Sequence, residues 1–273
     1  MPSVAAHPSS ILFVTLDSCR FDTFEAASAP TLRAVGPLHR AMAPGNFTFS
    51  SHAAMFVGFT PGVAGAGTPF VNPKLAKIFK LVGAGFQSHG GEFAVLRGHS
   101  IVDGLRRVGY RTFGSGAMGW FNPDVPTGRH LTQDFEEFLY PGRTWGLDAQ
   151  LSFAEAAVAA AGSDPLFLFL NIGETHVPYF HDGADWDPAR NPCVPFADDN
   201  DAAECRRRQL ACVAHIDRRL APLLDEFRGS TVVVCADHGD AWGEDGLWEH
   251  GISHEKVLEV PLLFRLGTPP PAP

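Results

Sequence analysis

The chain alternates short apolar runs with longer segments whose apolar residues recur at helical spacing. Three runs, Ile11–Leu16, Leu166–Leu170 and Thr231–Cys235, contain no charged residue. Runs of this length and composition are typical of parallel strands that are buried on both faces. A weaker apolar stretch predicts a further short strand at Tyr110–Phe113.

The segments between these runs predict helices. Ser100–Val108 is followed by a glycine that stops the helix, and Ala149–Ala161 is rich in alanine and amphipathic. Cys205–Phe227 carries its Leu, Val and Ile residues at helical spacing, with Pro222 within its last part or at a kink there. Strands and helices therefore alternate, a pattern that predicts an α/β fold with a mainly parallel sheet.

The remaining long segments predict loops and one end of a single domain. Segments 114–148 and 180–204 are rich in Gly, Pro, Asp and Asn, and we expect them to be loops over the active face. A length of 273 residues lies at the upper end for one hydrophobic core, so we expect a single domain over 1–266. The proline-rich residues 267–273 predict a frayed tail.

Composition and charge narrow the class of protein. Hydrophobic residues make up 45% of the chain, which excludes wholesale disorder. A net charge of -9 argues against a nucleic-acid partner, because phosphate contacts need a basic surface. No apolar run is long enough to span a membrane or to form a signal-peptide core, so we expect no membrane partner and a cytoplasmic location. The oligomeric state is left open.

The cysteines fit a reducing compartment. Their number is five, and none forms a CxxC pair, so reduced structural thiols are the main prediction. Cys193 and Cys205 bracket an acidic loop and form the one pair that we expect to bridge if the protein is exported.

Polar clusters follow the three strongest predicted strands. Asp17 follows the first, Glu174 and His176 the second, and Asp237 and His238 the third. The carboxyl ends of parallel strands share one edge of a sheet, so we expect these side chains to meet there. Carboxylate and imidazole groups together suit zinc or manganese. A single aspartate at a strand end is more often a helix N-cap, and the argument depends on the repetition.

A hydroxyl-rich segment adds a candidate nucleophile. Residues 46–56 include Thr48, and Ser50 or Ser51 is expected to cap a helix that begins near His52. The N-terminus of a helix favours anions, and a hydroxyl there beside a metal can attack phosphorus or sulfur. The alternative interpretation is a capping box without chemistry.

Five sequence segments, taken in order, resemble one family. They are LDSCRFD (16–22), TFSSHAAMFVGFTPG (48–62), GLRRVGYRT (104–112), GETHVPY (173–179) and CADHGDAWGEDGLWEHGISHEKVLEVPLLF (235–264). Together they resemble the alkaline phosphatase superfamily, in particular its sulfatase-like branch. The resemblance implies a three-layer sandwich around a mainly parallel sheet, here without the usual C-terminal subdomain.

The resemblance also assigns roles to residues. It implies that Asp17, Asp237 and His238 are metal ligands and that Thr48 is both a metal ligand and the nucleophile. It places His176 and His250 beside the transferred group or the leaving oxygen.

The departures from the sulfatase pattern favour phosphorus chemistry. The C/S-x-P-x-R motif that is oxidised to formylglycine is absent from the window beginning at Thr48, and threonine cannot become that aldehyde. His238 replaces the asparagine common in calcium-dependent sulfatases, which shifts the expected metal to zinc or manganese, with magnesium or calcium as alternatives. One metal ion is expected rather than two, because Glu174 and His176 have the wrong spacing for a second metal site. The other candidate ligands for a second ion are His181, His250 and His254.

The sequence thus predicts a metal-dependent hydrolase of phosphate monoesters, diesters or phosphonate esters, acting on a small-molecule ester. A sulfuric ester hydrolase, a phospho-group transferase of the same superfamily and a non-catalytic metal-binding scaffold are the alternatives. For the acids Asp240, Glu244 and Asp245, metal contact and a solvated loop position are both open. Arg206–Arg208 are interpreted as a solvated helix start.

Overall fold

The computed structural model describes residue 7 and residues 9–58 and 100–267. Its strands are β1 (Ile11–Leu16), β2 (His39–Met42), β3 (Arg111–Gly116), β4 (Glu137–Leu139), β5 (Leu166–Ile172), β6 (Thr231–Ala236), β7 (Ala241–Trp242), β8 (Trp248–Glu249) and β9 (Glu259–Arg265). Its helices are α1 (Phe21–Ala26), α2 (Pro30–Arg33), α3 (Thr48–Val57), α4 (Ile101–Arg107), η2 (Gly119–Phe121), α5 (Pro126–Thr132), α6 (Leu147–Ala161), α7 (Ala202–Glu226), η3 (Glu244–Gly246) and α8 (Glu255–Leu258).

A seven-stranded sheet organises the molecule, in the order β2-β9-β6-β1-β5-β3-β4. The three strands predicted with most apolar character, β6, β1 and β5, lie side by side and parallel at its centre. β9 is antiparallel to both β6 and β2, and β3 and β4 continue the parallel direction on the other side. The prediction of a mainly parallel sheet is therefore confirmed.

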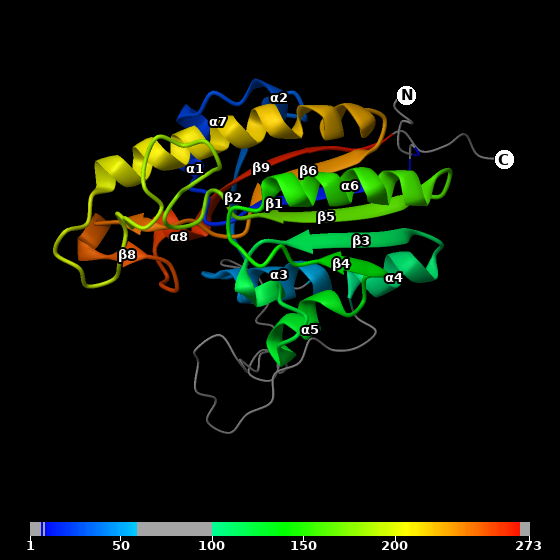
Figure 1. The fold of residues 1–273 in the computed structure, drawn as a ribbon, viewed down its shortest axis with the longest axis horizontal. Helices are drawn as coiled ribbons and strands as arrows, with labels where there is room; N and C mark the ends of the chain where they lie inside the picture. Colours follow the sequence, from blue (N-terminus) through cyan, green and yellow to red (C-terminus); the bar gives the residue numbers. More distant parts are fainter. Residues whose placement is uncertain (1–6, 8, 59–99, 268–273) are drawn as a thin grey trace, which may run out of the picture.

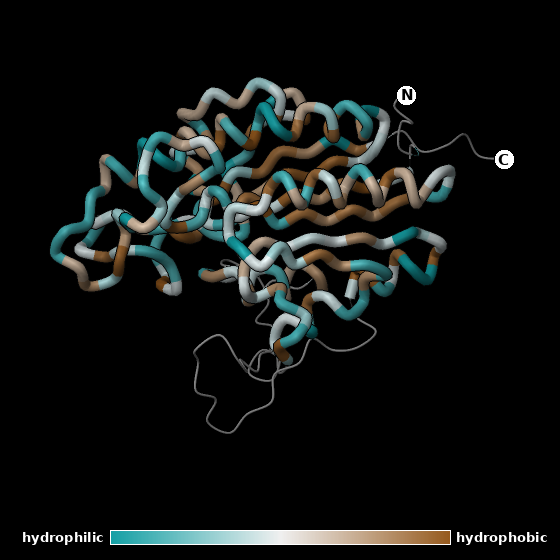
Figure 2. Tube along the Cα trace, viewed as in Figure 1, coloured by the Kyte–Doolittle hydropathy of each residue, from teal (hydrophilic) through white to brown (hydrophobic). Residues whose placement is uncertain are grey.

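Helices cover both faces of this sheet (Figure 1). Leu12, Val14 and Leu16 of β1 belong to one core cluster together with apolar residues of α6 and α7. The alternate residues Ile11 and Phe13 pack into a second cluster with residues of α3, α4 and α5. Successive side chains of a strand point to opposite faces, so a run that is apolar throughout serves both clusters. Figure 2 shows the central strands of the sheet among the most hydrophobic parts of the trace. The three-layer α/β architecture is confirmed.

One predicted loop contains regular structure. Segment 114–148 was expected to be a loop, but it includes the end of β3, helix α5 and strand β4. Pro126 occupies the first turn of α5, where its missing N–H removes no hydrogen bond. The other expected loop is irregular as far as Asp201, whose side chain accepts a hydrogen bond from Glu204 N and caps α7. The tail over 268–273 lies outside the described residues.

The start of α7 is less solvated than expected. Arg208 is only 1% exposed, and its guanidinium donates to the carbonyl oxygen of Arg190 at 2.7 Å. Its Nε also donates to Glu204 at 2.6 Å. The interpretation of a solvated basic run is therefore wrong for Arg208, which ties the helix to the preceding irregular segment.

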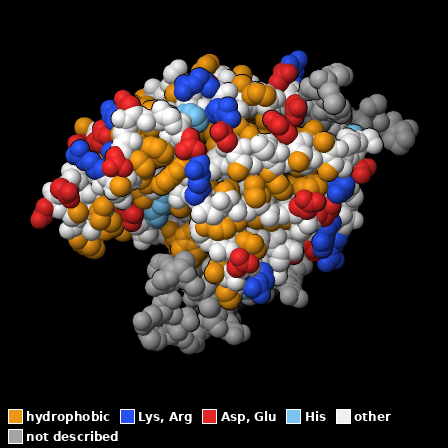
Figure 3. All heavy atoms as spheres, in the orientation of Figure 1, with side chains coloured by type: hydrophobic (Ala, Val, Ile, Leu, Met, Phe, Trp, Pro, Cys, Tyr) orange, Lys and Arg blue, Asp and Glu red, His pale blue; other side chains and the backbone are white. Residues whose placement is uncertain are grey.

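The five cysteines are all buried free thiols, as the main prediction expected. Acidic and basic side chains are interspersed on the face of the molecule shown in Figure 3. Arg219 of α7 and Asp148 of α6 form one such ion pair across neighbouring helices. Within the described ranges, no helix is both long and apolar enough to cross a membrane.

Candidate active site

Two buried carboxylates meet at the carboxyl edge of the central strands. In the register of β1 and β6, Leu16 pairs with Ala236, so Asp17 and Asp237 follow at the same level of the sheet. His238 is the next residue, and all three side chains are 0% exposed. One ligand atom from each residue lies within 4.8 Å of the other two. Three side chains predicted from the strand ends are thus brought together.

Thr48 completes this cluster from the other layer. It is the first residue of α3, and its Oγ1 lies 3.3 Å from Asp17 Oδ2 and 3.4 Å from His238 Nε2. The expected helix start near His52 is wrong by one turn. Ser50 and Ser51 do not cap the helix, because their hydroxyls donate to the backbone oxygens of Phe47 and Asp237. The Thr48 hydroxyl therefore lies at the helix end whose N–H groups favour negative charge.

The electrostatics of the cluster call for a positive charge. Burial and the charge of Asp17 raise the pKa of Asp237 well above its ordinary value. Burial also opposes ionisation of Asp17, but His176 and His238 more than offset it and lower the pKa of that carboxyl. Burial and the charge of His250 lower the pKa of His238 to about 3. Neighbouring carboxylates and a neutral imidazole, out of contact with water, are a donor set that a cation stabilises.

The details of the hydrogen bonds fit a divalent metal. Asp237 Oδ2 accepts no hydrogen bond from any residue that the structure describes. His238 Nδ1 lies 3.0 Å from the carbonyl oxygen of Gly239 and donates to it, which leaves Nε2 as an acceptor facing the two carboxylates. Carboxylate oxygen, imidazole nitrogen and a hydroxyl suit zinc or manganese. The residues present therefore fit the metal that the sequence implies.

Two residues that hold the cluster were not predicted. Asn171 Nδ2 donates to Asp17 Oδ2 at 2.9 Å and to Thr15 Oγ1 at 3.2 Å. His52 Nδ1 lies 2.7 Å from the Thr48 carbonyl oxygen, and its Nε2 lies 2.9 Å from Thr15 Oγ1. Burial lowers the pKa of His52 to about 4, so it acts as a neutral bridge. An asparagine just before a strand end, in an otherwise apolar run, was the signal in the sequence.

His176 and His250 lie beside the cluster, and their roles at the transferred group stay predictions. The ring of His250 has its centroid 4.4 Å from that of His238 and 5.1 Å from that of His176. His176 is placed by a turn after β5, in which its N–H donates to the Gly173 carbonyl oxygen. Three imidazoles therefore lie in sequence next to the buried carboxylates, His238 inside the cluster and the partly accessible His250 and His176 beyond it.

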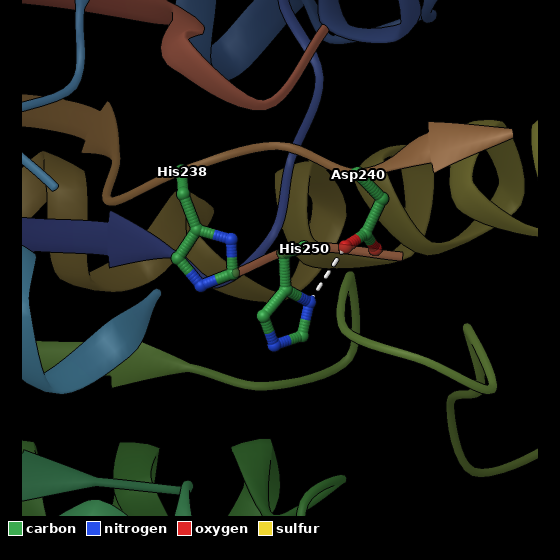
Figure 4. A group of neighbouring side chains, drawn as sticks. All are labelled: His238, Asp240 and His250. Carbon is green, nitrogen blue, oxygen red and sulfur yellow. Dashed lines mark hydrogen bonds and ion pairs between the residues drawn. The ribbon is translucent and has the colours of Figure 1, made fainter. Parts of the chain in front are cut away.

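Of the two alternatives left open for Asp240, a solvated loop position is excluded. It is 0% exposed, and its Oδ1 lies 2.7 Å from His250 Nδ1 (Figure 4). Burial opposes protonation of His250, but the charge and hydrogen bond of Asp240 prevail and raise the pKa of that imidazole to about 9. Glu244 forms an ion pair with Arg20 at 2.8 Å, and only Asp245, at 84% side-chain exposure, is a solvated loop acid.

Comparison with known proteins identifies the fold. No protein-family model and no curated protein matches the chain. The periplasmic domain of EptC from Escherichia coli, solved with Zn, aligns at a TM-score of 0.60 and 13% identity, over 98% of this chain and 77% of that one. A protein in the alkaline phosphatase superfamily from Vibrio parahaemolyticus aligns at 0.56 and 15%, over 98% and 65%. The phosphonate monoester hydrolase of Agrobacterium radiobacter aligns at 0.64 and 14%, over 94% and 68%.

This chain has the alkaline phosphatase-like fold. The resemblance inferred from the five sequence segments is confirmed at this level. The roles of Thr48 as nucleophile and of the ligand set as a metal centre stay predictions, because likeness at such low identity establishes the architecture alone.

In this alkaline phosphatase-like fold, several candidate ligands for a second metal ion lie away from the cluster formed by Asp17, Asp237 and His238. Glu174 accepts a hydrogen bond from Leu147 N at 2.8 Å, and burial raises the pKa of its carboxyl to about 7. His181 stacks on His215 with ring centroids 4.2 Å apart. His254 accepts a hydrogen bond from Lys256 N and caps α8. Of the other candidates, His250 forms a possible ligand group with His238 and Asp240, and His176 lies beside it.

Proposed function

We propose that this protein is a metal-dependent hydrolase of phosphate or phosphonate esters that uses Thr48 as its nucleophile. The observation that carries the proposal is the position of the Thr48 hydroxyl, at a helix N-terminus and within 3.4 Å of both Asp17 and His238. A scaffold that only binds a metal has no need of a hydroxyl at this place. The fold, which is shared with a phosphonate monoester hydrolase, supports the same choice.

Asp17, Asp237, His238 and Thr48 would hold one divalent ion, zinc or manganese. When bound, this ion would lower the pKa of the Thr48 hydroxyl and balance the charge of the phosphoryl oxygens. The helix N-terminus of α3 adds N–H donors on the same side. His238 contributes Nε2 because its other nitrogen is held by the Gly239 carbonyl oxygen.

The reaction proceeds in two displacements. The Thr48 hydroxyl first gives up its proton to water. Its oxygen then forms a bond to phosphorus while the bond from phosphorus to the leaving oxygen breaks, and His250 or His176 gives that leaving oxygen a proton. The phospho-threonine is then cleaved by water, whose proton returns to the same imidazole as Thr48 leaves. The ring of His250 lies next to that of His238 and the ring of His176 next to that of His250, which makes these two histidines the candidates for this proton transfer.

A substrate and variant panel tests this proposal. Metal-stripped protein is reloaded with zinc or manganese and assayed on an aryl phosphate monoester, a diester, a phosphonate ester and an aryl sulfate. We expect a phosphorus ester to be the best substrate and Thr48→Ala to lower kcat about 1000-fold or more. Thr48→Ser keeps the hydroxyl and is expected to retain most of the activity.

Covalent trapping completes the test. Intact mass after rapid quench should show a phosphoryl adduct in the wild type and none in Thr48→Ala. Sulfate as the best substrate, or full activity in Thr48→Ala, contradicts the proposal. Retained metal binding together with absence of turnover on every ester favours the metal-binding scaffold.

Transfer to an acceptor alcohol is the second candidate function. The structural likeness to the C-terminal domain of EptC favours this function, because EptC is a phosphoethanolamine transferase. The phospho-threonine can be cleaved by an alcohol instead of water with the same residues. Adding ethanolamine or glycerol to the assay separates the two, because a transferase releases the phosphorylated alcohol in place of inorganic phosphate.

The substrate and the location belong to this proposal too. We assign a small-molecule ester as substrate, no nucleic-acid or membrane partner, and a cytoplasmic location on the sequence evidence. The EptC domain that shares the fold is periplasmic, so the location is the point on which this protein and that domain are expected to differ.

A further inference from the structure

Asp240 has both carboxylate oxygens engaged, one by the partly accessible His250 and the other by the buried Tyr179. Oδ1 lies 2.7 Å from His250 Nδ1, and Oδ2 accepts a hydrogen bond from the Tyr179 hydroxyl at 2.7 Å. The Tyr179 oxygen in turn accepts a hydrogen bond from Trp242 Nε1 at 2.8 Å. Tyr179 and Asp240 are 0% exposed and Trp242 is 6% exposed. A continuous chain of hydrogen bonds therefore runs from the buried indole of Trp242 to the partly accessible imidazole of His250.

The backbone of Asp240 is fixed as firmly as its side chain. Gly239 N donates to Val257 O at 2.7 Å, and a Cβ at Gly239 would lie 2.2 Å from the Lys256 carbonyl oxygen. Arg20 donates to the Asp240 carbonyl oxygen at 3.3 Å. The loop is thus pressed against α8 on one side and held by a buried arginine on the other. A carboxylate held in this way can impose one orientation on its partner.

The contact with Asp240 selects one orientation of His250 and holds a proton on its Nδ1. A carboxylate accepts hydrogen bonds, so Nδ1 carries a proton and Nε2 is the nitrogen left for a substrate. In Figure 4 the Nε2 atoms of His238 and His250 point to the same side, away from Asp240. His176 differs, because its Nδ1 contacts the neutral carbonyl oxygen of Val177 at 2.9 Å.

A second metal ion is the rival explanation for His238, Asp240 and His250, whose ligand atoms lie within 4.8 Å of one another. Such an ion would need a carboxylate oxygen of Asp240, and both of these oxygens already take part in hydrogen bonds. Asp240 Oδ1 and His250 Nδ1 are paired directly, and Oδ2 is taken by Tyr179. The arrangement satisfies every oxygen of the carboxylate without an ion.

We propose that Asp240, held by Tyr179 and Trp242, is the positioning residue that turns His250 Nε2 toward the group transferred from Thr48. This inference rests on the proposed function for its kinetic consequence, but its structural content does not depend on turnover. Without Asp240, the imidazole of His250 is free to rotate and to change tautomer, so it delivers its proton to the leaving oxygen less often.

The first arm of the test reads the imidazole directly. Protein labelled with ¹⁵N-histidine is compared with Asp240→Asn, Tyr179→Phe and the matched control Asp245→Asn by long-range ¹H–¹⁵N correlation. We expect Nδ1 of His250, identified by its loss in His250→Ala, to carry the proton in the wild type and the control, and to lose it in Asp240→Asn. An unchanged tautomer in Asp240→Asn overturns the proposal, whether or not the protein hydrolyses any ester.

The second arm uses aryl phosphates whose leaving phenols differ in acidity. In Asp240→Asn, kcat is expected to fall about 10- to 100-fold for phenyl phosphate and less than about threefold for 4-nitrophenyl phosphate, with KM nearly unchanged. Tyr179→Phe, which keeps the carboxylate, should show a smaller loss of the same form. The double variant with His250→Ala should be no slower than His250→Ala alone. Equal losses on all phenols, or additive losses, overturn the proposal.

Metal analysis separates positioning from a second ion. The bound metal per chain is measured in the wild type and in Asp240→Asn after identical loading. We expect the same content in both. Loss of one ion per chain in the variant overturns the positioning role. Absence of turnover in the wild type contradicts the proposed function alone, since the histidine spectra still decide the role of Asp240.

Discussion

At the scale of single residues, the main feature of the site is a pair of adjacent buried carboxylates. Asp17 and Asp237 are both 0% exposed, and they come from neighbouring strands. Burying two carboxylates side by side is costly unless a cation or a proton compensates them. Backbone N–H groups of Ser18 and His238 donate to Asp237 Oδ1, but its second oxygen lacks a donor among the residues described. A cation would therefore be stabilised most by contact with Asp237 Oδ2, the oxygen without a hydrogen-bond donor.

Asn171 is expected to tune metal affinity although it is not a ligand. Its amide orients Asp17 through a bond of 2.9 Å, and removal of such a supporting bond weakens metal binding about 10- to 100-fold. Titration of metal-free Asn171→Ala with zinc or manganese by calorimetry measures the effect. Asn200→Ala, which changes an asparagine bonded to loop backbone at Val194, is the matched control. Equal affinities in the two variants would contradict the assignment.

The residues of the site were predictable to different degrees. Asp17, Asp237 and His238 directly follow apolar runs, so strand topology alone placed them together. Thr48 needed the resemblance to a family, because its helix start was misplaced by one turn. Asp240 could not be predicted, since an acid in a glycine-rich segment gives no sign that a distant tyrosine buries it.

At the scale of elements, apolar runs predicted the centre of the sheet better than its edges. β2 (HRAM) lies at one edge and β4 (EFL) at the other, and both are short and partly exposed, so neither produces an apolar run. Helix α5 was missed because PTGRHLT contains a single large apolar residue. Its stability comes from packing of Leu131 into the cluster beneath the sheet, which local sequence does not report.

Glu174 connects two elements and makes their junction sensitive to pH. Its carboxylate accepts a hydrogen bond from the first N–H of α6, and burial raises its pKa from 4.5 to about 7. The folded state therefore holds this proton more tightly than the unfolded state. The stability contribution is complete below about pH 4.5 and is lost as the pH rises through 7, by up to about 3 kcal/mol.

Replacement by a neutral isostere tests this linkage. We expect the free energy of unfolding of Glu174→Gln, relative to the wild type, to increase from pH 5 to pH 8, as measured by urea denaturation. Glu155→Gln changes an exposed acid of α6, the helix whose first N–H donates to Glu174, and should show no such trend. A difference between Glu174→Gln and wild type that is constant with pH would rule out a raised pKa at Glu174.

At the scale of the whole molecule, metal binding is expected to act as a stabilising ligand. An ion that binds only the folded chain adds about 2.7 kcal/mol at a concentration of 100 Kd, which for a chain of this size raises Tm on the order of 5–10 °C. Thermal unfolding before and after removal of the ion by a chelator measures this shift.

Asp237→Asn gives the opposite signature in the same experiment. It removes one of two adjacent buried charges, so we expect a higher Tm than metal-free wild type but no further rise when metal is added. A metal-dependent rise of wild-type size in Asp237→Asn would exclude Asp237 as a ligand.

The parallel register of the central strands has a consequence for how the sequence can change. Leu16 pairs with both Ile172 and Ala236, so the strand register fixes the positions of Asp17 and Asp237, which follow Leu16 and Ala236. One residue along a strand is about 3.3 Å, far more than the few tenths of an ångström that a metal centre tolerates. Insertions within β1 or β6 would therefore displace a ligand by a full step, whereas the irregular segment before α7 can change length without moving one. The sheet therefore sets the spacing of the ligands, and its strands are the part of the chain with least freedom to vary in length.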